Sequence, residues 1–106
     1  MELYAEYLKE RENANLVYDE KGFATYKESG ENIIYIIDVY VKPEFRKNRI
    51  ASSYLNLIAD KTKCQWLITS CDENANKWQE AEKAILGYGF NYKKNEGTMR
   101  WYSKEI

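Results

Sequence analysis

The segment Val41–Asn56, VKPEFRKNRIASSYLN, joins two different kinds of sequence pattern. Before it, Ile33–Val41 is almost continuous in isoleucine, valine and tyrosine, which predicts a strand buried on both faces. After Arg49, apolar residues recur at spacings of three and four, which predicts a helix that ends near Lys61. The turn between strand and helix contains a proline and four cationic side chains: Lys42, Pro43, Arg46, Lys47 and Arg49.

This basic turn is suited to bind an anion. The first N–H groups of a helix have no partner within the helix, and the positive end of the helix dipole lies at the same place. Phosphate binds to such a terminus even without help from side chains. The alternative is a solvated basic loop that holds no ligand.

The remaining patterns predict one domain over residues 1–106 with an α+β fold around a mixed sheet. Strand, helix and strand within so short a span imply a parallel pair joined by a right-handed crossover. Gly87 and Gly89 are well placed to end the last helix. The expected order is α-β-β-β-α-β-α-β-β, with helices over 2–12, 50–61 and 78–86 and strands over 16–18, 23–27, 33–41, 65–70, 90–93 and 98–102.

Composition excludes several classes of function. The chain has 106 residues, 44% of them apolar, a net charge of -1 and no histidine, so a catalytic site built on histidine is excluded. Cys64 and Cys71 bracket a predicted strand at a separation too long for a disulfide, so we expect free thiols and no metal site. Neither nucleic-acid binding nor a membrane span is indicated, and we expect a cytoplasmic protein. The cationic excess is local, with six basic and three acidic residues over 32–70.

The basic turn and its flanks resemble the GNAT superfamily of N-acetyltransferases. Ile36–Arg46, followed by Ile50 and Ala51, is similar to the family's acyl-CoA-binding pattern, a strand ending near V-x-P-x-x-R and then [QR]-x-x-G-x-[GA]. A second match lies downstream, where an amphipathic helix runs into Gly89-Phe90, as in the family's Y-x-x-x-G-F segment. Together these matches cover residues 33–92.

The resemblance implies a binding site for acetyl-CoA. In the family, the strand before the turn splays from its neighbour at a bulge, and the pantetheine arm enters the gap. Backbone amides from 47 to 52 would hold the pyrophosphate. The implied cofactor-binding residues are Val39, Tyr40, Val41, Arg46, Lys47, Asn48, Arg49, Ile50, Ala51, Ser52 and Asn76. Arg49 replaces the family glycine, where it could crowd the pyrophosphate or turn outward and pair with it.

The implied catalytic residues are Asp38 and Tyr88. Asp38 is the only carboxylate on the strand, inside an apolar run where a charge needs a role or a partner, so it is either the base or a structural aspartate. The family takes its oxyanion donor from backbone N–H at the bulge, here near Tyr40. The family tyrosine that protonates the CoA thiolate falls on Ile85, and Tyr88 is nearby, where it either replaces that acid or packs against the sheet.

Other polar residues have competing interpretations. Asn74 and Asn76 match loosely the family asparagine that contacts the pantetheine arm, and the alternative is that they cap the following helix. Cys71 lies at the end of a parallel strand, where ligands often bind, but the sequence offers no base to activate its thiol. We therefore do not expect Cys71 to be a nucleophile.

The resemblance implies an acetyl-CoA-dependent N-acyltransferase without a metal. The chain has room for one N-terminal helix where relatives use two to build the acceptor site. The amine acceptor is a small molecule or a protein, and the shortage favours a large acceptor presented from outside or a homodimer that completes the pocket. The alternatives are a CoA-binding or protein-interaction module that has lost the chemistry, favoured by Ile85 and Arg49, and an adaptor whose basic turn binds an acidic partner.

Overall fold

The computed structural model describes all 106 residues. It confirms the predicted order of elements, with one short 3₁₀ helix added in the basic turn. The elements are α1 (Glu2–Glu12), β1 (Asn15–Asp19), β2 (Gly22–Gly30), β3 (Ile33–Val41), the 3₁₀ helix η1 (Pro43–Phe45), α2 (Ile50–Thr62), β4 (Trp66–Asp72), α3 (Trp78–Gly87), β5 (Asn91–Glu96) and β6 (Met99–Glu105).

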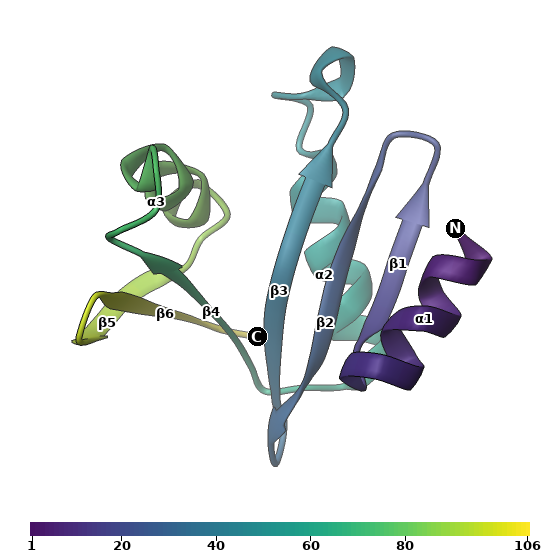
Figure 1. The fold of residues 1–106 in the computed structure, drawn as a ribbon, viewed down its shortest axis with the longest axis horizontal. Coiled ribbons are helices and arrows are strands. Elements are labelled where there is room, and N and C mark those ends of the chain that lie inside the picture. Colours follow the sequence, from purple (N-terminus) through teal and green to yellow (C-terminus); the bar gives the residue numbers. More distant parts are fainter.

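The six strands form one mixed sheet in the order β1-β2-β3-β4-β6-β5. All neighbours are antiparallel except the central pair β3 and β4, which is parallel as predicted. That pair is short, because only Ile33–Tyr35 and Trp66–Ile68 are in register. Beyond these residues the two strands part, so the sheet consists of two halves that meet at one end and diverge at the other (Figure 1). The splayed parallel pair predicted by the resemblance is confirmed.

A bulge in β3 changes which side chains face the core. Thr25 pairs with Asp38 while Tyr26 pairs with Ile36, so Ile37 is the extra residue. Before the bulge the buried side chains are at even positions, Ile34 and Ile36, and after it they are at odd positions, 39 and 41. The bulge therefore lies at Ile37, three residues before Tyr40, the residue near which the resemblance placed it.

The core lies on one face of the sheet, beneath α2 and α3. Tyr54, Leu55 and Ile58 of α2 pack with apolar side chains from both halves of the sheet, including Tyr102. Helix α1 lies on the opposite face at the β1–β2 edge (Figure 1), where Tyr4 meets the ring of Phe23 edge-on. None of the three helices combines the length and the apolar character needed to cross a bilayer.

One prediction of burial is wrong. The central strand β3 is buried on one face only, because Asp38 and Tyr40 on its other face are exposed. In α1 only Leu8 is buried, and Leu3 is 81% exposed. One short helix covers only the β1–β2 edge of that face, so the central strands there lack a second helical layer.

Candidate functional site

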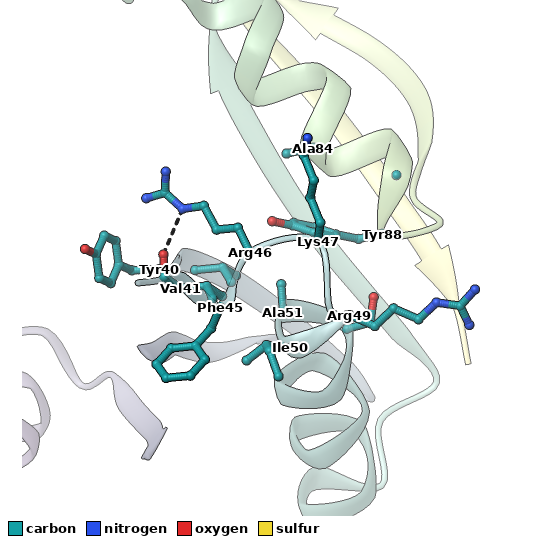
Figure 2. Close-up of a pocket in the computed structure, with 13 residues that line it drawn as sticks. Tyr40, Val41, Phe45, Arg46, Lys47, Arg49, Ile50, Ala51, Ala84 and Tyr88 are labelled. Atoms are coloured by element: carbon teal, nitrogen blue, oxygen red, sulfur yellow. Dashed lines mark hydrogen bonds between the residues drawn. The ribbon is translucent and has the colours of Figure 1, made fainter. Parts of the chain in front are cut away.

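The basic turn follows the free end of β3 and leads into α2. Pro43–Phe45 form the 3₁₀ helix, and Arg46 Nε then donates a hydrogen bond of 2.9 Å to the carbonyl oxygen of Val41 (Figure 2). The Arg46 guanidinium also lies 5.8 Å from the centre of the Tyr40 ring. Since Arg46 is held on the strand that it follows, the path of the turn is fixed at its start.

The backbone from Lys47 to Ser52 presents unpaired donors. None of these six N–H groups donates to a backbone carbonyl; the first bond in this region is Ser53 N–H to Arg49 O, at 3.1 Å. Lys47 and Arg49 have positive φ values of 69° and 59°. Left-handed residues within a turn direct successive N–H groups to one side, which makes an anion-binding nest. Together with the N-terminus of α2, the turn is a strong site for a phosphate group.

A cavity of about 520 Å³ opens beside these amides. Its walls come from the end of β3, the basic turn, the first turn of α2 and the C-terminal end of α3, and Figure 2 shows Lys47 extending from the turn toward Ala84 of α3. We call it the outer cavity. Nine of the predicted cofactor-binding residues line it: Val39, Tyr40, Val41, Arg46, Lys47, Arg49, Ile50, Ala51 and Ser52. Asn48 and Asn76 do not.

A second cavity of about 270 Å³, the inner cavity, lies where β3 and β4 part. Val39, Ala84 and Tyr88 line both cavities, so the two adjoin. The inner cavity is also lined by Asp38 from β3, by Cys71 from β4 and by Ile85 from α3. A ligand with a phosphate end and a narrow arm could therefore reach from the basic turn into the splay.

Strand alternation identifies the backbone donors that face this gap. Lys42 N–H donates to Lys21 O of the β1–β2 turn at 2.8 Å, and Asp38 N–H donates to Thr25 Oγ1 of β2 at 3.1 Å. Because N–H groups along a strand alternate in direction, Tyr40 N–H also faces β2, while those of Val39 and Val41 face the gap. The donors available to a ligand are thus the neighbours of Tyr40.

Asp38 lies at the edge of the inner cavity and is exposed. Its carboxylate takes part in none of the ion pairs, which join Lys94 to Glu96 and Arg100 to Glu73 and Glu82. The expectation of a charge enclosed in an apolar run is therefore wrong, because the bulge at Ile37 turns Asp38 to the solvent face of β3. A free carboxylate beside a cavity is available to accept a proton.

Tyr88 lies at the junction of the two cavities. It is half-buried, and this burial raises the pKa of its hydroxyl above the ordinary value of 10, while the positive charge of Arg46 opposes part of the rise. The hydroxyl is therefore protonated at neutral pH and can donate a proton. Ile85, at the family's tyrosine position, lines the inner cavity with an apolar side chain.

The capping role considered for Asn74 and Asn76 is wrong. The residue before α3 is Lys77, with φ 60°, and no side chain caps the helix. The Asn74 backbone N–H instead donates a hydrogen bond of 2.9 Å to the Asp72 carboxylate.

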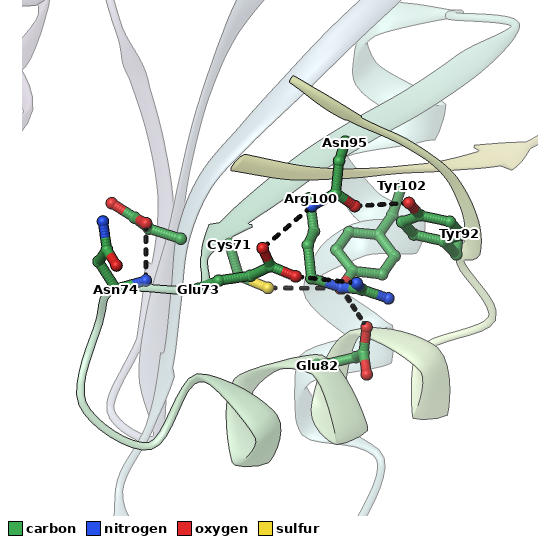
Figure 3. Close-up of polar contacts among 9 residues, drawn as sticks. Cys71, Glu73, Asn74, Glu82, Tyr92, Asn95, Arg100 and Tyr102 are labelled. Atoms are coloured by element: carbon green, nitrogen blue, oxygen red, sulfur yellow. Dashed lines mark hydrogen bonds and ion pairs between the residues drawn. The ribbon is translucent and has the colours of Figure 1, made fainter. Parts of the chain in front are cut away.

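One polar cluster was missed by sequence reasoning. Arg100 Nε donates to Glu82 at 2.8 Å and Arg100 Nη1 to Glu73 at 3.1 Å (Figure 3). The hydroxyl of Tyr102 donates to Glu82 at 2.5 Å and lies 3.4 Å from the sulfur of Cys71. The residues come from β4, the loop after it, α3 and β6, so no local pattern could have revealed the cluster. Cys64 and Cys71 are both free thiols, as predicted, and no group of three or more His, Cys, Asp or Glu side chains is arranged to hold a metal ion.

Comparison with known proteins identifies this architecture. The sequence model of the acetyltransferase (GNAT) family matches residues 1–88. No curated protein sequence matches the chain.

Solved structures share the fold at low sequence identity. A GNAT-family protein from Desulfovibrio desulfuricans superposes with a TM-score of 0.73 at 16% identity, over 98% of this chain and 76% of the other. The PaiA N-acetyltransferase of Thermoplasma acidophilum, in complex with coenzyme A, superposes with a TM-score of 0.65 at 18% identity, over 98% of this chain and 69% of the other. The microcin C7 self-immunity acetyltransferase MccE, in complex with acetyl-CoA and AMP, superposes with a TM-score of 0.68 at 14% identity, over 98% of this chain and 67% of the other.

Several of these structures are considerably longer than this chain. It spans 64% of a GNAT-family acetyltransferase from Listeria monocytogenes and 63% of an acetyltransferase from Thermus thermophilus. At such identities the likeness establishes the fold.

Proposed function

Because the chain belongs to the acetyltransferase (GNAT) family, whose sequence model matches residues 1–88, we propose that it transfers an acetyl group from acetyl-CoA to an amine. The observation that carries the proposal is the run of six unpaired N–H groups from Lys47 to Ser52, beside a cavity that leads into the splay of β3 and β4. The CoA and acetyl-CoA complexes of PaiA and MccE, which have the same fold, support it.

The outer cavity fits the nucleotide end of acetyl-CoA. The amides of the turn and of the first turn of α2 would bind the pyrophosphate, and Lys47, which extends over the cavity, would add a cation (Figure 2). Val39 and Val41 would pair their backbone groups with the amides of the pantetheine arm. Apolar side chains from β3 and α3 line the path to the inner cavity, where the thioester would lie.

The inner cavity supplies the groups that acetyl transfer needs. Asp38 would take a proton from the attacking amine, directly or through water. A backbone N–H of Val39 or Val41 would stabilise the oxyanion that forms on the carbonyl. Tyr88, held protonated by its burial, would give a proton to the departing CoA thiolate. Each of these groups lines one or both cavities.

We expect the acceptor to be a large molecule that carries an amine, such as a protein side chain or terminus. The sheet face opposite α2 and α3 is covered only at its β1–β2 edge, by α1 (Figure 1). An acceptor could approach the splay across this open face. A second copy of the chain could complete the acceptor pocket at the same place.

A second candidate is a CoA-binding module with little or no turnover, favoured by Ile85 at the place of the family tyrosine. The two are separated by incubating the purified protein with acetyl-CoA and a panel of amines, including polyamines and lysine-containing peptides, and measuring free CoA thiol. Thiol release that depends on both the amine and the protein supports the transferase. Saturable CoA binding without release from any amine supports the binding module.

A further inference from the structure

A third cavity, of about 510 Å³, lies at the other end of α2 from the basic turn. The outer cavity is lined by the first turn of α2, whereas this one is lined by Lys61 and Thr62 of the last turn. Its remaining walls come from the last part of β2, the β2–β3 turn and the starts of β1 and β3. We call it the distal cavity. It shares no lining residue with the outer or the inner cavity, so the proposed acetyl transfer does not use it.

Tyr26 of β2 brings a buried hydroxyl without a partner to this cavity. Three tyrosines are buried in the core, and two of them, Tyr54 and Tyr102, donate their hydroxyl protons to carboxylates. Tyr26 is 6% exposed and its hydroxyl makes no hydrogen bond, so burial alone raises its pKa above 10. A buried tyrosine hydroxyl usually has a partner. Tyr26 therefore carries an unused hydrogen-bonding group at neutral pH.

The Tyr26 hydroxyl is open to the distal cavity. The side-chain polar atoms that are both unpaired and closed off from solvent are Trp101 Nε1 and Ser103 Oγ, and the Tyr26 hydroxyl is not among them. It therefore keeps access to solvent although the rest of the residue is almost fully enclosed. Since Tyr26 lines the distal cavity, that access is through the cavity.

The distal cavity carries an excess of negative charge. Glu28 of β2 and Glu31 of the following turn line it, and neither carboxylate takes part in an ion pair. Lys61 is the only cationic side chain in its walls. The C-terminal end of α2 adds the negative end of the helix dipole, which favours cations within the last turn. The balance of charge thus favours a cationic ligand.

The donor set suits an organic ammonium ion better than a metal ion. The two carboxylates belong to no group of three or more side chains that could hold a metal. The neutral groups beside them are the Tyr26 hydroxyl and the side-chain amides of Asn15 and Asn32. An ammonium group has three N–H donors, and hydroxyl, amide and carboxylate oxygens all accept from it.

We propose that the distal cavity binds a small organic cation through a primary ammonium group, held by Glu28, Glu31 and the hydroxyl oxygen of Tyr26. This site is separate from Asp38 and does not rest on the proposed function. Ile33 and Ile34 line the cavity and belong to the short parallel pairing of β3 with β4. A bound cation therefore lies against the closed end of the splay, and it stabilises the folded state because the unfolded chain has no such site.

The test is an NMR titration of the ¹⁵N-labelled full chain with 1,4-diaminobutane at constant ionic strength and neutral pH. We expect saturable shifts of the backbone amides of Gly30, Asn32 and Thr62, which line the cavity. Tyr26→Phe should weaken binding by about 3–10-fold. Because the hydroxyl has no partner within the protein, this variant should keep its stability to urea. Tyr18→Phe is the matched control, an exposed tyrosine of β1 outside the cavity, and should bind as the wild type does.

Charge substitutions test the sign of the interaction. Glu28→Gln should weaken binding, whereas Lys61→Gln removes the opposing charge and should strengthen it by about twofold. Asp38→Asn should leave the titration unchanged, which separates this site from that of the acceptor amine. Shifts that grow linearly without saturation, wild-type affinity in Tyr26→Phe, weaker binding in Lys61→Gln, or tighter binding of Ca²⁺ than of the diamine would each overturn the proposal.

Discussion

The Thr69 hydroxyl on β4 donates a hydrogen bond of 3.0 Å to the carbonyl oxygen of Ile36 on β3. It lies immediately beyond Tyr35 and Ile68, the last residues at which the two strands pair. Past this point the strands diverge around the inner cavity, which both Ile36 and Thr69 line. The bond thus holds the closed end of the splay, and we regard it as the point that fixes the width of the gap.

Thr69→Val should loosen this end of the cavity. Valine keeps the shape of the buried side chain but leaves the Ile36 carbonyl without this donor, so the free energy of unfolding should fall by about 1–2 kcal/mol. Acetyl-CoA affinity should fall as well. Thr62→Val is the control, because it also removes a side-chain bond to a carbonyl, that of Ile58 in α2, but far from the gap. Equal losses of affinity in both variants would argue against this role of Thr69.

Asp38→Asn should reduce amine acetylation by about 10²–10⁴-fold and leave acetyl-CoA binding intact, because the amide cannot accept the amine proton. Since Asp38 is exposed and has no ion-pair partner, the thermal unfolding temperature should hardly change. Asp60→Asn, an exposed position on α2, makes the same chemical change away from the cavity. Full activity in Asp38→Asn would remove this carboxylate from the mechanism.

Arg49→Gly should stabilise the protein. Arg49 has φ 59° and ψ 24°, a left-handed conformation that glycine adopts without strain, so the free energy of unfolding should rise by roughly 1 kcal/mol. In Figure 2 the side chain extends away from the outer cavity, so acetyl-CoA affinity should be at least retained. Arg49→Ala removes the same charge but keeps a Cβ, and it should give no such gain in stability. Weaker binding in both variants would show that the guanidinium contacts the phosphates.

The contact between Tyr54 and Asp19 predicts a pH dependence of stability. Tyr54 of α2 donates to Asp19 at 2.5 Å, and this bond is the main reason why the pKa of Asp19 is below its ordinary value of 3.8. Its contribution should be complete above pH 3.8 and disappear as the pH falls through the lower pKa of the folded protein.

Tyr54→Phe should therefore lower the free energy of unfolding at pH 7 by about 1 kcal/mol, a reduced value because Asp19 is exposed. The difference from wild type should shrink in urea titrations between pH 4 and about pH 2. A difference that stays constant over this range would contradict the assigned cause.

Much of the fold could be predicted, because the spacing of apolar residues and the glycines that end helices are local signals in the sequence. Gly89, with φ 95°, follows α3 as its position suggested. The resemblance implied a bulge near Tyr40, but its position at Ile37 could not be predicted, because Ile-Ile-Asp-Val fits a strand in either register and the choice is made by pairing with β2. This single residue explains why Asp38 faces solvent and why Tyr40 N–H is not directed into the gap.

The candidate site was predicted only in part for related reasons. Lys47 and Arg49 were expected near the phosphates because of charge, but their left-handed backbone is unusual for such residues and has no sequence signal. The cluster of Tyr102, Glu82 and Arg100 exists only because α3 packs over β4 and β6.

Calorimetric titration of the purified protein with acetyl-CoA at moderate salt tests the central claim most directly. We predict saturable micromolar binding, weakened about tenfold or more by Lys47→Glu, because Lys47 lines the outer cavity. Lys42→Glu makes the same change of charge at a residue that does not line it, and it should have a much smaller effect. Absence of binding up to millimolar acetyl-CoA, or equal weakening by both substitutions, would contradict a phosphate site at the start of α2.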